Sequence, residues 1–96
     1  MLLSIVIINY NTKDQLRACL GSIKKYNIDD TETIIVDNAS VDGSVAMARY
    51  QFPWARVIAC ESNLGFAGGC NKGAHESTGK YLLFLNPDVE LKKDTL

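Results

Sequence analysis

The sequence predicts an α/β fold with a Rossmann-like parallel sheet, in the element order βαβαβαβ. Short β-branched apolar runs alternate with longer segments in which apolar residues recur at helical spacing. An expected helix joins each expected strand to the next, which is the connection that parallel neighbouring strands require. In addition, an acidic residue, Asp37 or Asp88, closely follows two of the strands. Ligands of α/β proteins bind at that edge of the sheet.

The first strand and the first helix have the clearest patterns. Residues 3–9 form an almost unbroken apolar run, which predicts a strand that is covered on both faces and central in its sheet. A helix is expected to begin at Thr12, with a capping box between Thr12 and Gln15. Its apolar stripe should face the sheet and consists of Leu16, Cys19, Leu20 and Ile23.

The remaining elements follow in the same alternation. A second strand is expected over residues 32–36, and a second helix, capped by Ser40 or Asp42, should run to about Tyr50 before the break at Pro53. The third strand (56–60) precedes a polar, glycine-rich stretch (61–69), a helix to about Ser77 and a strand over 80–85. Residues 91–96 resemble the start of another helix. We therefore expect one domain, residues 1–96, that is the amino-terminal part of a larger fold.

Composition excludes several classes of protein. The chain has 96 residues, is 47% hydrophobic and 22% charged, and has a net charge of -1, so it lacks the basic character of nucleic-acid-binding domains. No apolar run approaches the ~20 residues that span a bilayer, and no signal peptide is recognised, which predicts a cytoplasmic protein. Three widely spaced cysteines without a CxxC pair argue against a disulfide framework or a zinc site.

The two acids at strand ends each allow two interpretations. Asp88 follows Asn86 and Pro87, and its carboxylate suits a magnesium or manganese ion that grips phosphate oxygens. Alternatively, Asp88 is a turn residue or the cap of a following helix. Asp37 suits a hydrogen bond to a base or ribose, or else it forms an Asx-turn with the residues up to Ser40.

Two further features point to a nucleotide. The glycine-rich segment 63–73 follows a strand and enters a helix, where backbone N–H groups favour anions, although a tight turn with close helix packing is the favoured explanation for the glycines taken alone. The segment is neither GxGxxG nor a P-loop. Tyr10, at the exit of the first strand, could stack on a base or cover the edge of the core. Covalent catalysis is disfavoured because His75 is the lone histidine and no serine lies in a G-x-S-x-G elbow.

Taken in order, four blocks of the sequence resemble the family 2 glycosyltransferases of the GT-A fold. The blocks are residues 4–11, 35–43, 63–73 and 85–88, and the likeness covers essentially the whole chain. The Asn-Pro-Asp-Val form of residues 86–89 is most similar to the rhamnosyltransferase-type subgroup. The resemblance implies the nucleotide-sugar-binding half of such an enzyme, truncated before the half that holds the acceptor and the catalytic base.

The resemblance also implies a role for each matching residue. Tyr10 would lie against the base, Asp37 would hydrogen-bond uracil or thymine, and Asp88 would ligate a Mg²⁺ or Mn²⁺ ion that bridges the diphosphate. Asn86 occupies the first acidic position of the family's Asp-x-Asp motif, which predicts a lower metal affinity. The expected nucleotide-binding residues are thus Tyr10, Asp37, Asn63, Gly65, Asn71 and Asn86, and the expected metal ligand is Asp88.

The implied reaction is inverting transfer of a sugar from a UDP- or dTDP-sugar to a hydroxyl of a glycan or lipid-linked acceptor. Because the family's general base lies downstream of the metal motif, we expect this chain to bind the donor without appreciable turnover. A homodimer is also expected, as is a position at the inner face of a membrane for a longer protein. Two alternatives are a non-catalytic nucleotide-binding or assembly module, and a response-regulator or flavodoxin-like domain that is phosphorylated at Asp37 or binds flavin.

Overall fold

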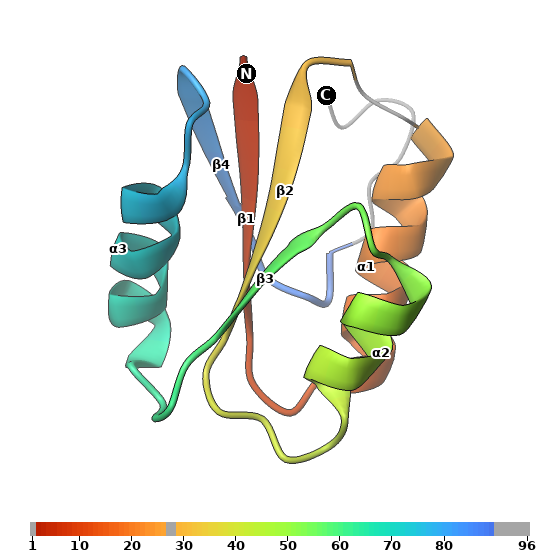
Figure 1. Cartoon of the computed structure of the whole chain (residues 1–96), viewed down its shortest axis with the longest axis vertical. Coiled ribbons are helices and arrows are strands. Elements are labelled where there is room, and N and C mark those ends of the chain that lie inside the picture. Colours follow the sequence, from red (N-terminus) through yellow and green to blue (C-terminus); the bar gives the residue numbers. More distant parts are fainter. Residues whose placement is uncertain (1, 27–28, 90–96) are drawn as a thin grey trace.

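The computed structural model describes residues 2–26 and 29–89, and it has the predicted alternation of strands and helices (Figure 1). The elements are β1 (Leu3–Asn9), α1 (Lys13–Tyr26), β2 (Thr31–Asp37), α2 (Ser44–Gln51), β3 (Arg56–Ala59), α3 (Gly65–Glu76) and β4 (Tyr81–Leu85). The helix expected over residues 91–96 lies outside the described residues.

The described strands form one parallel sheet in the order β3-β2-β1-β4. β1 lies between β2 and β4, which confirms the central position predicted from its apolar run. The register places Asn9 beside Asp37 and Ile7 beside Leu85. Because the strands are parallel, the loops that follow them all begin at the same edge of the sheet.

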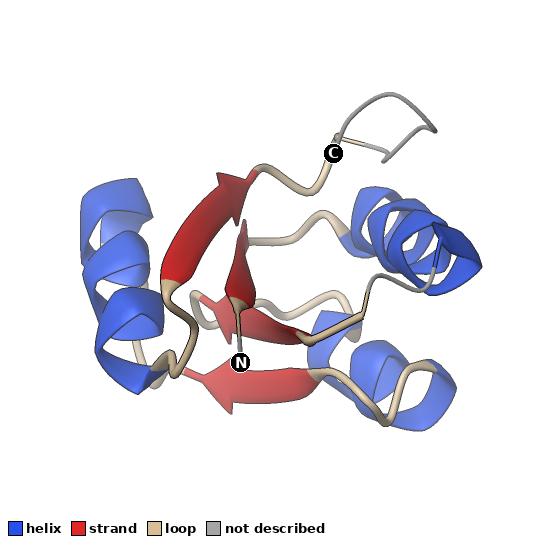
Figure 2. Ribbon diagram, turned by 90° about the horizontal axis from the view of Figure 1, so that it is seen from above, coloured by secondary structure: helices blue, strands red, loops and turns tan. Residues whose placement is uncertain are grey.

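Helices cover both faces of the sheet, with α1 and α2 on one face and α3 on the other (Figure 2). On the first face, Ile5 and Ile7 of β1 pack with the predicted stripe of α1, which is buried throughout. On the second face, α3 covers a smaller apolar cluster of Val6, Ile8, Ile34 and Val36. Each such side chain contributes about 1.5–3 kcal/mol when it is fully buried. The apolar residues of β1 therefore contribute to a core on each face of the sheet.

The glycine-rich stretch is mostly helical, so its expected assignment to a loop over residues 61–69 is wrong from Gly65 onward. The cause is close packing of α3 on the sheet. A Cβ atom added at Gly73 would collide with the side chain of Val6 and press on that of Val36. Absence of that atom lets the helix backbone approach the strands, which is the packing alternative for these glycines.

Asp42 joins the starts of the two helices on the first face. Instead of forming the predicted capping box, the Thr12 hydroxyl donates to Asn9 Oδ1 (2.6 Å), and the first N–H of α1, that of Lys13, donates to Asp42 Oδ2 (2.9 Å). Asp42 also accepts the N–H of Ser44, the first residue of α2 (3.0 Å), and so acts as a capping group from the position before the N-cap, which is Gly43. Burial raises the pKa of Asp42, but hydrogen bonds from Ser44 and Lys13 outweigh this and lower it overall.

β4 is an edge strand of the described sheet, and several of its apolar side chains face solvent. Tyr81 is 58% exposed, Leu82 41% and Phe84 38%. α3 lies over β1 and β2, and this arrangement leaves the outer part of the sheet uncovered.

Among the described residues, no helix has both the length and the apolar character needed to cross a membrane.

At the amino-terminal end of the strands, opposite the predicted site, Glu32 of β2 forms hydrogen bonds with β1 and with the segment before β4. Its carboxylate accepts hydrogen bonds from the hydroxyl of Ser4 (2.6 Å) and from the backbone N–H (2.6 Å) and hydroxyl (2.7 Å) of Thr78. The Ser4 oxygen in turn accepts the N–H of Gly79 (2.8 Å). Partial burial raises the pKa of Glu32, but the hydrogen bonds from Ser4 and Thr78 more than offset it, and the net shift is downward.

We predict that Glu32→Gln lowers the free energy of unfolding at pH 7 by about 1–2 kcal/mol, because charge-assisted bonds become neutral ones. The folded-state pKa of Glu32 lies below the unfolded value. Its stabilisation is therefore complete above the unfolded pKa of about 4.3 and is lost as the pH falls through the folded pKa. Urea unfolding at pH 7, 5 and 3.5 should show the wild-type advantage shrinking at the lowest pH.

Glu76→Gln is the matched control, because Glu76 forms a surface ion pair with Arg56 (2.9 Å). Exposed pairs contribute little, so this variant should change stability by less than about 1 kcal/mol. Equal losses for the two variants at pH 7 would contradict the proposed role of Glu32.

Candidate functional site

Most of the predicted site residues lie in the loops that follow the strands, at one edge of the sheet (Figure 1). Tyr10 follows β1, Asp37 ends β2, and the segment from Asn63 to Gly65 connects β3 to α3. Asn86 and Asp88 follow β4. Asn71 differs, because it lies six residues beyond Gly65 on α3. That separation corresponds to about 9 Å along the helix axis.

Asp37 is buried, with 2% of its surface exposed, and its carboxylate is occupied by the protein itself. Oδ1 accepts hydrogen bonds from Asn9 Nδ2 and from the Ser40 hydroxyl (both 2.8 Å), and Oδ2 accepts the Ser40 N–H (2.9 Å). The turn interpretation of Asp37 is therefore confirmed, and its contact with a base stays a prediction. The response-regulator alternative requires Asp37 to accept a phosphoryl group, and the burial of its carboxylate disfavours that role.

The same hydrogen-bond network fixes the backbone on both sides of Tyr10. On one side, Asn9 is held by Asp37 and by the Thr12 hydroxyl. On the other side, the N–H of Asn11 donates to Ser40 Oγ, and Asn11 Oδ1 accepts the N–H of Val41 (both 2.8 Å). The Tyr10 ring remains 50% exposed. An exposed ring on an anchored backbone is well suited to stacking against a planar ligand.

Asn38 connects this network to the loop before α3. Its side-chain oxygen accepts the N–H of Leu64 (3.3 Å), and its amide nitrogen donates to the carbonyl of Gly65 (3.1 Å). Asn63 Oδ1 accepts the N–H of Gly65 (2.8 Å), whose φ of +73° suits glycine. Sequence analysis did not identify Asn9 or Asn38 as site residues, although an amide at the end of an apolar strand was a signal for the first.

Asp88 lies in a tight turn after β4. The N–H of Val89 donates to the carbonyl of Asn86 (3.0 Å), and Pro87 takes the second position of the turn, which its fixed φ favours. The turn interpretation of Asp88 is therefore confirmed. The two interpretations are compatible, since Asp88 is exposed.

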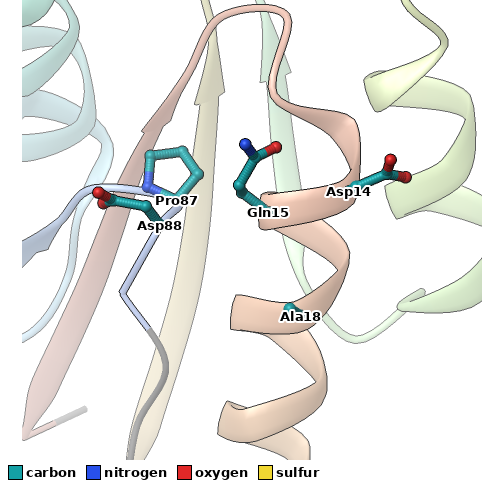
Figure 3. A pocket seen from close by; sticks show the side chains of 5 residues that line it. All are labelled: Asp14, Gln15, Ala18, Pro87 and Asp88. Atoms are coloured by element: carbon teal, nitrogen blue, oxygen red, sulfur yellow. The ribbon is translucent and has the colours of Figure 1, made fainter.

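A cavity of about 310 Å³ separates this turn from the first half of α1. It is lined by Asp14, Gln15, Ala18, Pro87 and Asp88. Figure 3 shows Gln15 on the side of α1 that faces the Pro87 ring, whereas the carboxylate of Asp14 points the other way. The volume is at the lower end of the range for small-molecule sites.

The acidic residues that the structure describes fit a metal site in which a bound ligand supplies part of the coordinating oxygen atoms, rather than a site in which the protein supplies all of them. Within residues 2–26 and 29–89, no group of three or more His, Cys, Asp or Glu side chains is placed to hold a metal ion. Mg²⁺ is commonly bound by one or two carboxylates together with phosphate oxygens. Asp88, exposed at a strand end, fits that arrangement.

Comparisons with known proteins agree with this geometry. The model of the family "Glycosyl transferase family 2" matches residues 4–96. An "Uncharacterized glycosyltransferase" of Haemophilus influenzae is 40% identical over 87 residues, which are 91% of this chain and 29% of the relative. This chain thus spans less than a third of that relative's length.

Two solved structures share the fold over most of the chain. S. aureus TarS 1–349 in complex with UDP-GlcNAc has a TM-score of 0.88 at 24% identity, covering 99% of this chain and 29% of TarS. The mannosyltransferase PcManGT of Pyrobaculum calidifontis, in complex with GDP-Man and Mn²⁺, has a TM-score of 0.83 at 23% identity, covering 92% of this chain and 28% of PcManGT. With the family model matching nearly its whole length, the chain belongs to the family 2 glycosyltransferases and has the fold of the amino-terminal region of a GT-A enzyme.

Proposed function

We propose that residues 1–96 form the donor-binding part of an inverting glycosyltransferase that uses a UDP- or dTDP-sugar. The observation that carries the proposal is the gathering of the strand-end loops at one edge of the sheet, with Tyr10 and Asp88 exposed there. The UDP-GlcNAc complex of TarS, which has the same fold, supports a nucleotide-sugar donor.

The base is proposed to stack on Tyr10 and to hydrogen-bond at the exit of β2. Asp37 has three donors on its two oxygens, and a carboxylate has about four acceptor positions, so capacity remains for one base N–H. Asn63 and Gly65 would line the pocket beside it, and Asn86 would lie near the diphosphate. Asn71 would be reached only by a ligand group that extends along α3.

Asp88 is the proposed ligand of a Mg²⁺ or Mn²⁺ ion, as the Mn²⁺ complex of PcManGT supports. Such an ion would supply positive charge that stabilises the departing diphosphate. Asp88 contributes the negative charge and Asn86 a neutral amide oxygen, so the site should bind the ion weakly until the diphosphate is present. The exposure of Asp88 leaves its oxygens accessible for this purpose.

The acceptor and the general base are proposed to belong to a longer protein. This chain covers 29% of its H. influenzae relative, which supports a role in donor binding alone. We propose a glycan or lipid-linked acceptor, a location in the cytoplasm or at the inner face of a membrane, and a member of the rhamnosyltransferase-type subgroup. Sugar transfer by the purified chain at ordinary enzyme rates would contradict this division of roles.

The first test is nucleotide binding by the purified chain. Thermal unfolding is measured with uridine, thymidine, guanosine and adenosine diphosphates, each with Mn²⁺ and with a chelator. At a hundred times the dissociation constant, a ligand should add about 2.7 kcal/mol to the free energy of unfolding. We expect stabilisation by a pyrimidine diphosphate with Mn²⁺. Equal stabilisation by all four nucleotides would argue against a base pocket, and stabilisation by none would contradict donor binding by this chain.

A second test separates the two acids. Asp88→Asn should weaken diphosphate binding by about tenfold in Mn²⁺ and have little effect in chelator, because it removes one charged ligand. Asp37→Ala should weaken binding under both conditions, because it disturbs the base pocket.

Isothermal titration checks these affinities. Because Asp37→Ala also removes a buried acceptor, titrations are made at a temperature where circular dichroism shows the variant to be folded. Asp29→Asn is the control, since Asp29 is an exposed acid that precedes β2, at the opposite end of the strands from Asp88. Equal losses for Asp88→Asn with and without metal would rule out its assignment as a metal ligand.

A homodimer stays a prediction, and the exposed apolar residues of β4 are its structural basis. Pairing of two copies through this edge would cover Tyr81, Leu82 and Phe84. Light scattering should then give a mass that rises with concentration toward twice that of one chain. A constant monomer mass at millimolar concentration would contradict the dimer.

A further inference from the structure

The Asn38 side chain links the end of β2 to the start of α3. Asn38 is the first residue after β2, and it is 2% exposed. Its backbone N–H donates to the carbonyl of Asn9 (2.8 Å), which fixes its main chain to the end of β1. Its side chain extends instead toward the loop before α3, and both halves of the amide find partners there.

The partners of Asn38 belong to one short turn, residues 63–65. Asn38 accepts the N–H of Leu64 and donates to the carbonyl of Gly65, so it holds this turn by two groups of opposite polarity. Within the same turn, the side-chain oxygen of Asn63 accepts a hydrogen bond from the N–H of Gly65. Leu64 is 45% exposed, and its side chain lies close to Gly68 in the first turn of α3.

We propose that Asn38 is a positioning residue that keeps the 63–65 turn in the conformation that binds the donor nucleotide. This inference rests on the proposed function, because the turn contains two of the expected nucleotide-binding residues. The apparent affinity of a site falls in proportion to the fraction of molecules in the competent conformation. Loss of Asn38 should therefore weaken nucleotide binding even though Asn38 is buried.

The chemistry of the position explains why an amide is present. A carboxamide supplies one acceptor and two donors on a single planar group, which matches an N–H and a C=O on the same turn. An aliphatic side chain would leave both backbone groups without this partner. A carboxylate would accept the N–H of Leu64 but would face the carbonyl of Gly65 with like polarity.

The first measurement is amide hydrogen exchange of the ligand-free chain, which does not depend on the function. In the wild type, the N–H groups of Leu64 and Gly65 should be protected, because side chains of Asn38 and Asn63 accept them. Asn38→Ala should raise the exchange rate of the Leu64 amide about tenfold or more and leave the amides of β1 unchanged. Unprotected Leu64 in the wild type would overturn the proposal, even if the variant failed to fold.

The second measurement is the dissociation constant for UDP with Mg²⁺. Asn38→Ala should raise it about tenfold, as a competent fraction of about one tenth implies. Gln51→Ala, an exposed amide at the end of α2, is the control and should bind as the wild type does.

The possible results distinguish the two claims. If Asn38→Ala frees the Leu64 amide but binds UDP as tightly as the wild type, the positioning role is overturned and the proposed function stands. If the wild type binds no nucleotide, the proposed function fails, and with it the role of Asn38 in binding, whatever the amide exchange shows.

Discussion

The hydrogen bond between Asn9 and Asp37 is the interaction on which the candidate site depends. These residues end the two central strands, lie beside each other in the register, and are almost completely buried. A buried carboxylate without donors would be strongly destabilising, so the loops must fold to supply them. Ser40 does so from one loop, and its hydroxyl then holds Asn11 in the other. The positions of Tyr10 and of the loop residues follow from this one buried charge.

At the carboxyl ends of the strands, the buried polar residues and the exposed residues have different roles. Asn9, Asp37 and Asn38 make their hydrogen bonds inside the protein and set the shape of the loops. Tyr10 and Asp88 extend from the anchored backbone and remain accessible to a ligand. At the opposite end of the strands, the Glu32 carboxylate also links separate segments by hydrogen bonds, and these bonds stabilise the fold. The charged residues of the sheet therefore maintain geometry at both edges, and ligand chemistry is expected at one.

Patterns within one segment were sufficient for the elements apart from the start of α3, whereas interactions between distant segments were not predictable. The apolar run of β1 and the stripe of α1 specified the strand, the helix and their buried faces. The predicted capping box was wrong because the Thr12 hydroxyl donates to Asn9 at the end of β1, and Asp42, distant in sequence, accepts the first N–H of α1. The position of Asn38 likewise depends on which loop lies next to β2. The glycines of α3 were ambiguous, since their packing against Val6 appears only once the sheet is formed.

The central claim is that the strand-end loops form one site for a nucleoside diphosphate. Mapping backbone amide chemical shifts while UDP is added with Mg²⁺ tests it most directly. The account predicts shifts in all four loops, near Tyr10, Asn38, Leu64 and Asp88, and little change at the Glu32 edge. Shifts confined to a single loop, or centred on the Glu32 edge, would contradict a shared donor site.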